Sequence, residues 1–411
     1  MLINRKEVVE VSRLRHINMK QILPELKEIN KHLSFAKRAF TSGGFRHFTQ
    51  YINGLIALNK KTIKKISEAT IKQVHQSLIN RILNDAKFEQ ELLEKRYLKK
   101  VRFITKGHYI ILIFDDSLVE RNGKHIEETQ SHKDHTKNKF ITGHQFFTSM
   151  IYTALVHLPL FPILYSKNTQ SKIEMAGELI DKIHVESDIK LNAVLMDSWY
   201  SDKKLIKKCM TKGIKVVCGI KTNRNISLKR DEWINLSDFS KAQNTASFED
   251  FIIDDRIYQV ASYNVKLSGI PKIKLLISKE YFDDKKEWSK NFHLISTSRD
   301  DSPVKILRLY SLRWHIETFH RDIKQNLGFD KAFLRLKEGI VRHAIFSVIA
   351  YIILKLFMFQ RGFSNMSIGA CITHIQNKEM DGFILDIIEI EDKNERIAYF
   401  QEVFIRETAK V

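Results

Sequence analysis

The sequence predicts a mixed α/β protein, in which a mixed sheet with helices packed against it follows a helical N-terminal segment. Three observations lead to this fold class. Apolar residues recur at helical spacing before residue 108, short β-branched and aromatic runs then alternate with helical patterns, and the helical period fades between residues 221 and 297. With 411 residues, 43% of them hydrophobic, the chain can bury a substantial core in two or three domains.

Positive charge is concentrated at the N-terminus. The whole chain has 68 Lys or Arg against 48 Asp or Glu, a formal charge of +20, and residues 1–107 have 23 against 9, an excess of 14. In "INGLIALNKKTIKKISEATIKQVHQSLINRIL" (52–83), apolar residues at spacings of three and four predict amphipathic helices. We therefore predict that residues 1–107 form a basic helical domain that binds a polyanion such as nucleic acid. An anionic membrane is the competing partner.

The sequence favours a cytoplasmic protein that does not contact a membrane. Its start, "MLINRKEVVEVSRLRHINMK", is charged throughout, unlike a signal peptide. The apolar stretch "AIFSVIAYIILKLFMF" (344–359) contains Lys355 and is shorter than the roughly 20 residues that span a bilayer, so we predict a buried helix. The three cysteines, Cys209, Cys218 and Cys371, are too scattered for a zinc site or a disulfide framework, which fits a reducing compartment.

The strand pattern begins at "HYIILIFDD" (108–116), which ends in two acids, as a buried central strand does. Two more strands, then a helix, a strand, a helix and a strand are predicted after it. The two strands span 139–156 and 158–165, with Pro159 and Pro162 marking a turn or an edge. The elements after them are a helix at 169–185, a strand at 192–200, a helix at 201–213 with Ser201 as its N-cap, and a strand at 214–220. This order indicates a mixed sheet with helices against it.

Residues 221–297 are predicted to form an all-β insertion, with hairpin strands at 247–267 and 272–282 and another strand at 291–297. Beyond the insertion, Ser302 is the predicted N-cap and Pro303 the first residue of a helix that includes "YSLRWHIETFHRDIKQNLGF" (310–329). We expect residues 108–362 to form one catalytic domain and residues 363–411 a C-terminal helical segment.

Two aspartates end apolar strands in similar settings, Asp115 in "IFDDS" and Asp197 in "LMDSW". A carboxylate at the end of a buried strand costs desolvation free energy unless it is paired or binds a cation. Either residue alone is also explained as a helix N-cap or a turn former. If the two strands are adjacent, both acids lie at one edge of the sheet, where a third carboxylate would complete a site for two Mg²⁺ or Mn²⁺ ions.

Glu317 is the candidate for the third carboxylate. On a helix, at about 100° per residue, the residues near its face are Tyr310, Arg313, Arg321 and Lys324. Solvated salt bridges are one explanation of this charge. The other is that Glu317 binds metal while its neighbours hold DNA phosphates.

The spacing Y-x2-R-x3-E-x6-K, formed by Tyr310, Arg313, Glu317 and Lys324, resembles the signature of a large group of bacterial insertion-sequence DDE transposases. The elements around Asp115, in a D-x-T/S pattern, and Asp197, in "MDSWYSDKKLIKKCMTKGIKVVCGIKTNR", resemble the same group, and the resemblance spans residues 108 to about 360. It implies an RNase H-like catalytic domain with a β-strand insertion between the second Asp and the Glu.

The resemblance also implies the roles of individual residues. Asp115, Asp197 and Glu317 would be catalytic and would bind two Mg²⁺ ions, for which Mn²⁺ can substitute, while Tyr310, Arg313, Lys324 and also Arg321 would contact DNA. Asp116 adjoins Asp115 and faces the other side of a regular strand; Asp115 is preferred because it stands two residues before Ser117. An aromatic residue of the insertion, such as Trp233 or Trp288, could stack on an extruded base, although a packed structural role explains either equally well.

The function that follows is a cut-and-paste DNA transposase that forms hairpin intermediates, acts on double-stranded terminal inverted repeats and target DNA, and pairs the ends as a homodimer. Two alternatives stay open. One is an RNase H-like, structure-selective DNA nuclease without strand transfer, and the other is a catalytically silent DNA-binding derivative. Strand-transfer activity on terminal-repeat DNA separates the transposase from the nuclease, and three intact acids argue against the silent derivative.

Overall fold

The computed structural model describes residues 26–69, 74–123, 125–134, 138–229, 232–392 and 394–397. Ile22 and Leu23, two of the apolar residues at helical spacing near the N-terminus, and the end of the 363–411 segment lie outside the described residues. Contacts divide the chain into two units. The helical unit comprises the chain up to Tyr97, Gly123–Glu127 and the chain from Arg321 onward. The sheet unit comprises Leu98–Asn122 and Glu128–His320. Helices from both ends of the sequence thus share one unit, whereas three consecutive domains were expected; those domain boundaries remain predictions.

The helical unit is built around one long apolar helix, α12 (Lys337–Arg361), which ends at Gly362 in the left-handed conformation (φ 69°). Near it, the rings of Phe48 and Phe346 lie 4.9 Å apart, centre to centre. Among the described residues α12 is the one helix long and apolar enough to cross a membrane, and 83% of its most apolar window is buried inside the protein. The buried helix expected at 344–359 is therefore confirmed. The other helical elements of this unit are α2 (Lys27–Asn30), η1 (Lys31–Phe35), η2 (Lys37–Ala39), α3 (Ser42–Ala57), α4 (Ile63–Ala69), α5 (Gln76–Asn84) and α13 (Ile368–Ile388). Two helices, α6 (Gln90–Thr105) and α11 (Trp314–Leu327), have residues in both units.

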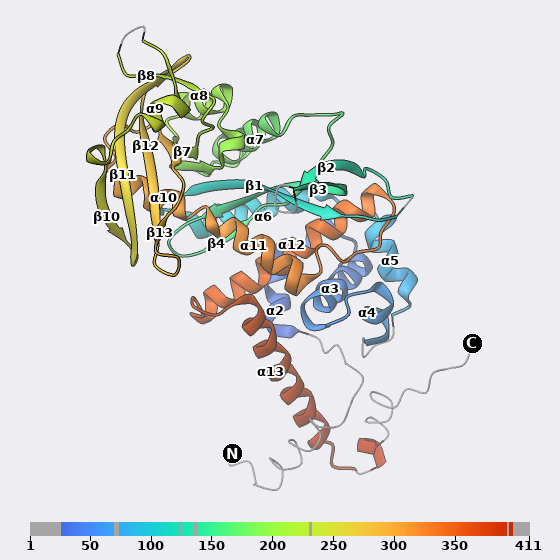
Figure 1. The fold of residues 1–411 in the computed structure, drawn as a ribbon. Coiled ribbons are helices and arrows are strands. Elements are labelled where there is room, and N and C mark those ends of the chain that lie inside the picture. Colours follow the sequence, from blue (N-terminus) through green and yellow to red (C-terminus); the bar gives the residue numbers. More distant parts are fainter. Residues whose placement is uncertain are drawn as a thin grey trace. The chain divides into compact units, whose positions relative to one another are not determined.

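The sheet unit contains one large mixed sheet, as the sequence predicted. Strand β1 (Ile111–Glu120) pairs antiparallel with β3 (Lys139–Tyr152) and parallel with β6 (Ala193–Met196), and β6 pairs parallel with β7 (Lys215–Gly219) (Figure 1). On the outer side of β3 lie β2 (Gln130–Asp134), β4 (His157–Pro159) and β5 (Ile163–Tyr165). The central strands contain runs of consecutive buried apolar residues, as strands covered on both faces do.

The interval between residues 221 and 297 extends this sheet rather than forming a separate one. Strand β14 (Phe292–Ser296) pairs with β7, and the long strands β12 (Ile270–Phe282) and β11 (Arg256–Leu267) continue from it. Figure 1 shows β11 and β12 side by side. The remaining strands are β8 (Asn225–Ser227), β9 (Ile234–Asn235), β10 (Glu249–Ile253) and β13 (Glu287–Trp288). The interval is rich in strands, as expected, and in addition contains the short helix α9 (Leu236–Lys241) and the 3₁₀ turn η5 (Thr245–Ser247).

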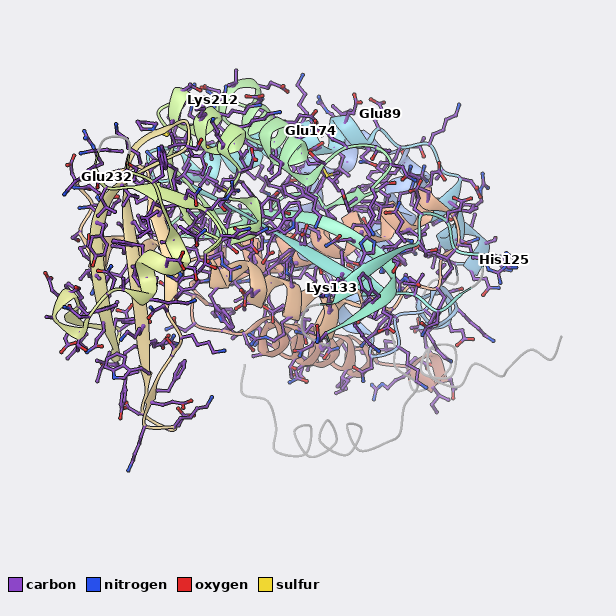
Figure 2. The ribbon with its side chains drawn as sticks, turned by 45° about the horizontal axis from the view of Figure 1, so that its top comes forward. Glu89, His125, Lys133, Glu174, Lys212 and Glu232 are labelled. Carbon is purple, nitrogen blue, oxygen red and sulfur yellow. The ribbon has the colours of Figure 1, made fainter. Side chains whose placement is uncertain are left out.

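The helices α7 (Lys172–Asp181) and α8 (Lys203–Thr211) lie side by side on one face of the sheet. Asp181 accepts ion pairs from Lys208 (2.5 Å) and Lys212 (2.9 Å), which join the two helices. Figure 2 shows Lys212 near the outer side of this helical layer, with Glu174 of α7 in the same layer. Two further elements, the π-helical turn Lys182–Glu186 and the 3₁₀ turn η4 (Ser198–Tyr200), complete the connections.

Two local predictions were wrong. The N-cap of α8 is Asp202, whose side chain accepts a hydrogen bond from the N–H of Lys204, while the hydroxyl of Ser201 donates to the carbonyl of Ser198 (2.7 Å). The stretch 310–329 is also not one helix. Ser302 and Pro303 do begin a helix, but this helix, α10 (Pro303–Ser311), ends before α11 begins.

Candidate active site

The first acid, Asp115, lies on β1 just past the end of a parallel ladder. The pairing of β1 with β6 covers Ile111 to Ile113, so Asp115 extends beyond its neighbour on that side. Its Oδ1 accepts a hydrogen bond from the main-chain N–H of Asp116 (2.8 Å), and its Oδ2 accepts one from Nη1 of Arg313 (3.1 Å). Burial raises the pKa of the Asp115 carboxyl to about 7; the Asp116 N–H and Arg313 oppose the rise, and the charge of Asp197 adds to it.

The adjacent acid, Asp116, has different partners on the other face of the sheet. Its carboxylate lies 2.5 Å from Nζ of Lys172 on α7 and accepts a hydrogen bond from the hydroxyl of Tyr200 (2.8 Å). The Lys172 side chain is only 8% exposed, so this pair is largely shielded from water. Asp116 is therefore engaged in packing α7 and η4 onto β1, and Asp115 is the acid that faces α11.

The second acid, Asp197, directly follows β6 and caps the turn η4. Its Oδ1 accepts hydrogen bonds from the N–H groups of Trp199 (2.9 Å) and Tyr200 (3.3 Å). The N-cap role that the sequence left open is thus present. Asp197 follows the strand that pairs parallel with β1, and its charge raises the pKa values of Asp115 and Tyr310.

The third acid, Glu317, lies in the first turn of α11 and meets Asp115 at one guanidinium. Arg313 donates from Nη1 to Asp115 and from Nη2 to Oε1 of Glu317. Arg313 belongs to the break between α10 and α11, where N–H groups bond three residues back, as in Arg313 to Tyr310 (3.0 Å) and Ile316 to Arg313 (3.1 Å). The tight turns orient Arg313 so that it bridges two carboxylates from different elements.

Tyr310, in the last turn of α10, borders the same cluster. The centre of its ring lies 5.7 Å from the guanidinium carbon of Arg313 and 5.4 Å from the ring centre of Phe292. Burial raises the pKa of its hydroxyl to about 12. Its hydroxyl therefore stays protonated at neutral pH and can donate to a phosphate oxygen.

Four further predicted residues lie elsewhere. Arg321 and Lys324 follow Glu317 by one and two turns of α11 and fall in the helical unit. Trp233 and Trp288 are 49% and 37% exposed, and the Trp288 ring lies 5.2 Å from that of Tyr281. The residues that the sheet unit brings together are thus Asp115, Asp197, Tyr310, Arg313 and Glu317.

The donor chemistry of the site fits hard divalent cations. Carboxylate oxygens are the ligands that Mg²⁺ prefers, and the raised pKa of Asp115 indicates a carboxylate whose burial is not fully compensated. In the part of the chain that the structure describes, no three His, Cys, Asp or Glu side chains are grouped to hold a metal ion. Between Asp115 and Glu317 the positive charge comes from Arg313, which donates to Oδ2 of Asp115 and to Oε1 of Glu317.

Replacing Asp115 by Asn is expected to stabilise the protein at high pH. Because the folded-state pKa of Asp115, about 7, lies above its ordinary value of 3.8, the unfolded chain ionises first and stability falls as pH rises between these values. The free energy of unfolding of Asp115→Asn should exceed that of the wild type by roughly 1–2 kcal/mol at pH 8, with the lost Arg313 contact offsetting part of the gain, and the difference should vanish near pH 4.

Urea unfolding at both pH values measures this difference, with the exposed Asp284→Asn as the control. A variant less stable than the wild type at pH 8 would show that Arg313 fully compensates the buried charge.

The sequence did not single out three side chains that organise this site. Lys172 and Tyr200 hold Asp116, and Thr148 on β3 donates a hydrogen bond to the main-chain oxygen of Asp115 (2.9 Å). Thr148 carries the one available signal, because it is a buried hydroxyl within the apolar run "QFFTSMIY". The partners of Lys172 and Tyr200 depend on tertiary contacts alone.

Comparisons with known proteins show the family to which the chain belongs. Residues 106–353, more than half of the chain, match a family model described as the transposase DDE domain, and the matched span includes all three acids. Among solved structures, the cryo-EM structure of a piggyBac transposase synaptic complex with hairpin DNA is similar over 98% of this chain and 86% of that chain, with 11% identity and a TM-score of 0.45. No curated protein matches the chain in sequence.

Proposed function

Because the chain belongs to the transposase DDE domain family, we propose that it is a DNA transposase that cleaves the ends of its own insertion sequence and joins them to target DNA by a cut-and-paste route. The observation that carries this proposal is the meeting of Asp115 and Glu317 at Arg313, beside Asp197. Asp115 on β1 and Glu317 on α11 thereby share one guanidinium, and Asp197 directly follows β6, the strand next to β1. Carboxylates and a guanidinium so placed suit phosphodiester chemistry.

We propose that Asp115, Asp197 and Glu317 hold two Mg²⁺ ions, for which Mn²⁺ can substitute. When bound, such a pair activates the attacking oxygen and stabilises the leaving oxygen. Arg313 and Tyr310 bind and orient the phosphate at the cleaved position, through a fork of N–H donors and a protonated hydroxyl. Water attacks in the first step, and the freed 3′-hydroxyl attacks in the next steps, through a hairpin intermediate and then on target DNA.

The basic N-terminal region supports the proposed partners. Its excess of 14 positive charges suits contacts to the backbone of double-stranded DNA, including the terminal inverted repeats. Arg321 and Lys324 would add phosphate contacts along α11. We further propose that the protein acts in the cytoplasm, without membrane contact, and pairs the two DNA ends as a homodimer.

A strand-transfer assay tests the proposed function. Linear DNA that ends in the element's terminal repeats is incubated with the full chain, Mg²⁺ and a supercoiled target plasmid. We expect cleavage at the repeat ends and covalent joining of the 3′-ends to the plasmid. Cleavage without joining would instead support a nuclease, and DNA binding without cleavage would support a silent DNA-binding protein.

A further inference from the structure

Two side chains link the strand that carries Asp115 to the helix that carries Glu317. The hydroxyl of Thr148 donates to the main-chain oxygen of Asp115 (2.9 Å), and Oγ1 of the same residue lies 2.7 Å from Nε2 of His320. Thr148 stands directly opposite Asp115 in the β1–β3 ladder. His320 lies on α11, three residues after Glu317 and hence nearly one turn along the helix.

The direction of these hydrogen bonds determines whether Nε2 of His320 carries a proton. A threonine hydroxyl has one proton, and here that proton goes to the carbonyl of Asp115. Oγ1 must therefore accept from His320, so Nε2 of His320 carries a proton. The linkage is then a directed chain from the His320 N–H to the Thr148 hydroxyl and on to the Asp115 carbonyl.

The surroundings of Thr148 in the sheet indicate that its hydroxyl is there for its hydrogen bonds rather than for packing. On the same face of β3, the neighbouring side chains Phe146 and Met150 are apolar and buried, at 2% and 0% exposure, and Thr148 itself is 1% exposed. A buried hydroxyl costs free energy unless both its donor and its acceptor capacity are satisfied. An apolar residue would pack at this position without that cost, yet it could not join Asp115 to α11.

We propose that Thr148 and His320 are positioning residues that set the separation of the Asp115 and Glu317 carboxylates. This inference rests on the proposed function of the same acids. Arg313 bridges these acids directly through carboxylate oxygens, for which a bound metal ion would compete. The Thr148–His320 chain uses main-chain and side-chain atoms other than the carboxylates, so it can hold β1 and α11 in register after Arg313 has moved.

Matched substitutions test this role. Thr148→Val and His320→Phe keep the approximate size and remove the hydrogen bonds, whereas Thr148→Ser keeps the hydroxyl and His320→Gln places an amide N–H near the position of Nε2. Thr211→Val is the control, because Thr211 also donates to a main-chain carbonyl, that of Lys208 (3.0 Å), but is exposed. For each protein, Mn²⁺ affinity of the complex with repeat-ended DNA is measured by electron paramagnetic resonance, together with the cleavage rate and the DNA Kd in Ca²⁺.

We expect Thr148→Val and His320→Phe to weaken Mn²⁺ binding and slow cleavage, each by about 10-fold, as losses of supporting contacts around a metal site do. The DNA Kd should change by less than about 2-fold, because these residues are placed to orient carboxylates rather than phosphates. Thr148→Ser, His320→Gln and Thr211→Val should bind Mn²⁺ like the wild type.

Wild-type Mn²⁺ affinity in both Thr148→Val and His320→Phe would overturn the proposal, and so would equal losses in the Ser and Val variants of Thr148. If Thr148→Val fails to fold, the Phe and Gln variants of His320 decide the question by themselves. Failure of the wild type to cleave DNA would instead contradict the proposed function, and the Mn²⁺ affinities would still show whether the chain positions the acids.

Discussion

Glu317→Gln is expected to abolish DNA cleavage and strand transfer while leaving DNA binding intact. The substitution keeps the size of the side chain and its ability to accept from Arg313, but it removes the negative charge that a divalent cation requires. We expect cleavage of repeat-ended DNA to fall by at least about 10³-fold, a loss of about 4 kcal/mol of transition-state stabilisation. Gel-based cleavage in Mg²⁺ measures the rate, and the Kd for the same DNA in Ca²⁺ measures binding.

The matched control is Glu186→Gln, an exposed glutamate at the end of the π-helical turn that follows α7. Its cleavage rate should equal that of the wild type. Cleavage by Glu317→Gln within about 10-fold of the wild-type rate would mean that this residue holds no catalytic metal ion.

Arg313→Ala is expected to reveal the two roles of the guanidinium. In metal-free buffer, the change leaves Asp115 and Glu317 partly buried without their shared cation, so the free energy of unfolding should fall by about 2 kcal/mol. Mg²⁺ should then raise the melting temperature of the variant more than that of the wild type, because the ion no longer has to displace Arg313. Cleavage should still drop by about 10²-fold, because the bidentate phosphate contact is lost.

Two comparisons separate these effects from a general loss of charge. Arg308→Ala, at an exposed arginine of α10, should change neither stability nor the Mg²⁺-dependent rise in melting temperature. Arg313→Lys should behave like Arg313→Ala, since one ammonium group cannot reproduce the fork that reaches both acids. Equal responses to Mg²⁺ in Arg313→Ala and the wild type would show that Arg313 does not compete with metal ions.

Much of the catalytic core follows from patterns that are local in the sequence. The run before Asp115 and the run before Asp197 are short, apolar and rich in β-branched residues, and each forms a buried strand of the sheet. Ser302 and Pro303 signal the start of α10 by side-chain chemistry alone. The sequence also predicted that Asp115 and Asp197 lie past neighbouring strands, and β1 and β6 do pair in parallel. However, β1 continues beyond Asp115 to Glu120 by pairing with β3, so only Asp197 follows the end of a strand.

The features that the sequence did not predict are of two kinds. Some depend on which of two competing local arrangements forms, and others depend on contacts between residues distant in the sequence. No glycine or proline marks the break between α10 and α11, although this break is what orients Arg313 toward Asp115. Ser201 and Asp202 are both good N-cap residues, and the choice of Asp202 follows from the hydrogen bond that Ser201 makes to Ser198. The polar strand β2, with the sequence QSHKD, lacks an apolar alternation and forms by pairing with β3.

The most direct test of this account is a cryo-EM structure of the protein bound to repeat-ended DNA in Ca²⁺, an ion expected to bind without supporting cleavage. We predict Ca²⁺ bound to the carboxylates of Asp115, Asp197 and Glu317, with Arg313 moved from these acids to a DNA phosphate and the Thr148–His320 hydrogen bond retained. An ion held by other residues, or Arg313 still bridging Asp115 and Glu317 in the DNA complex, would contradict it.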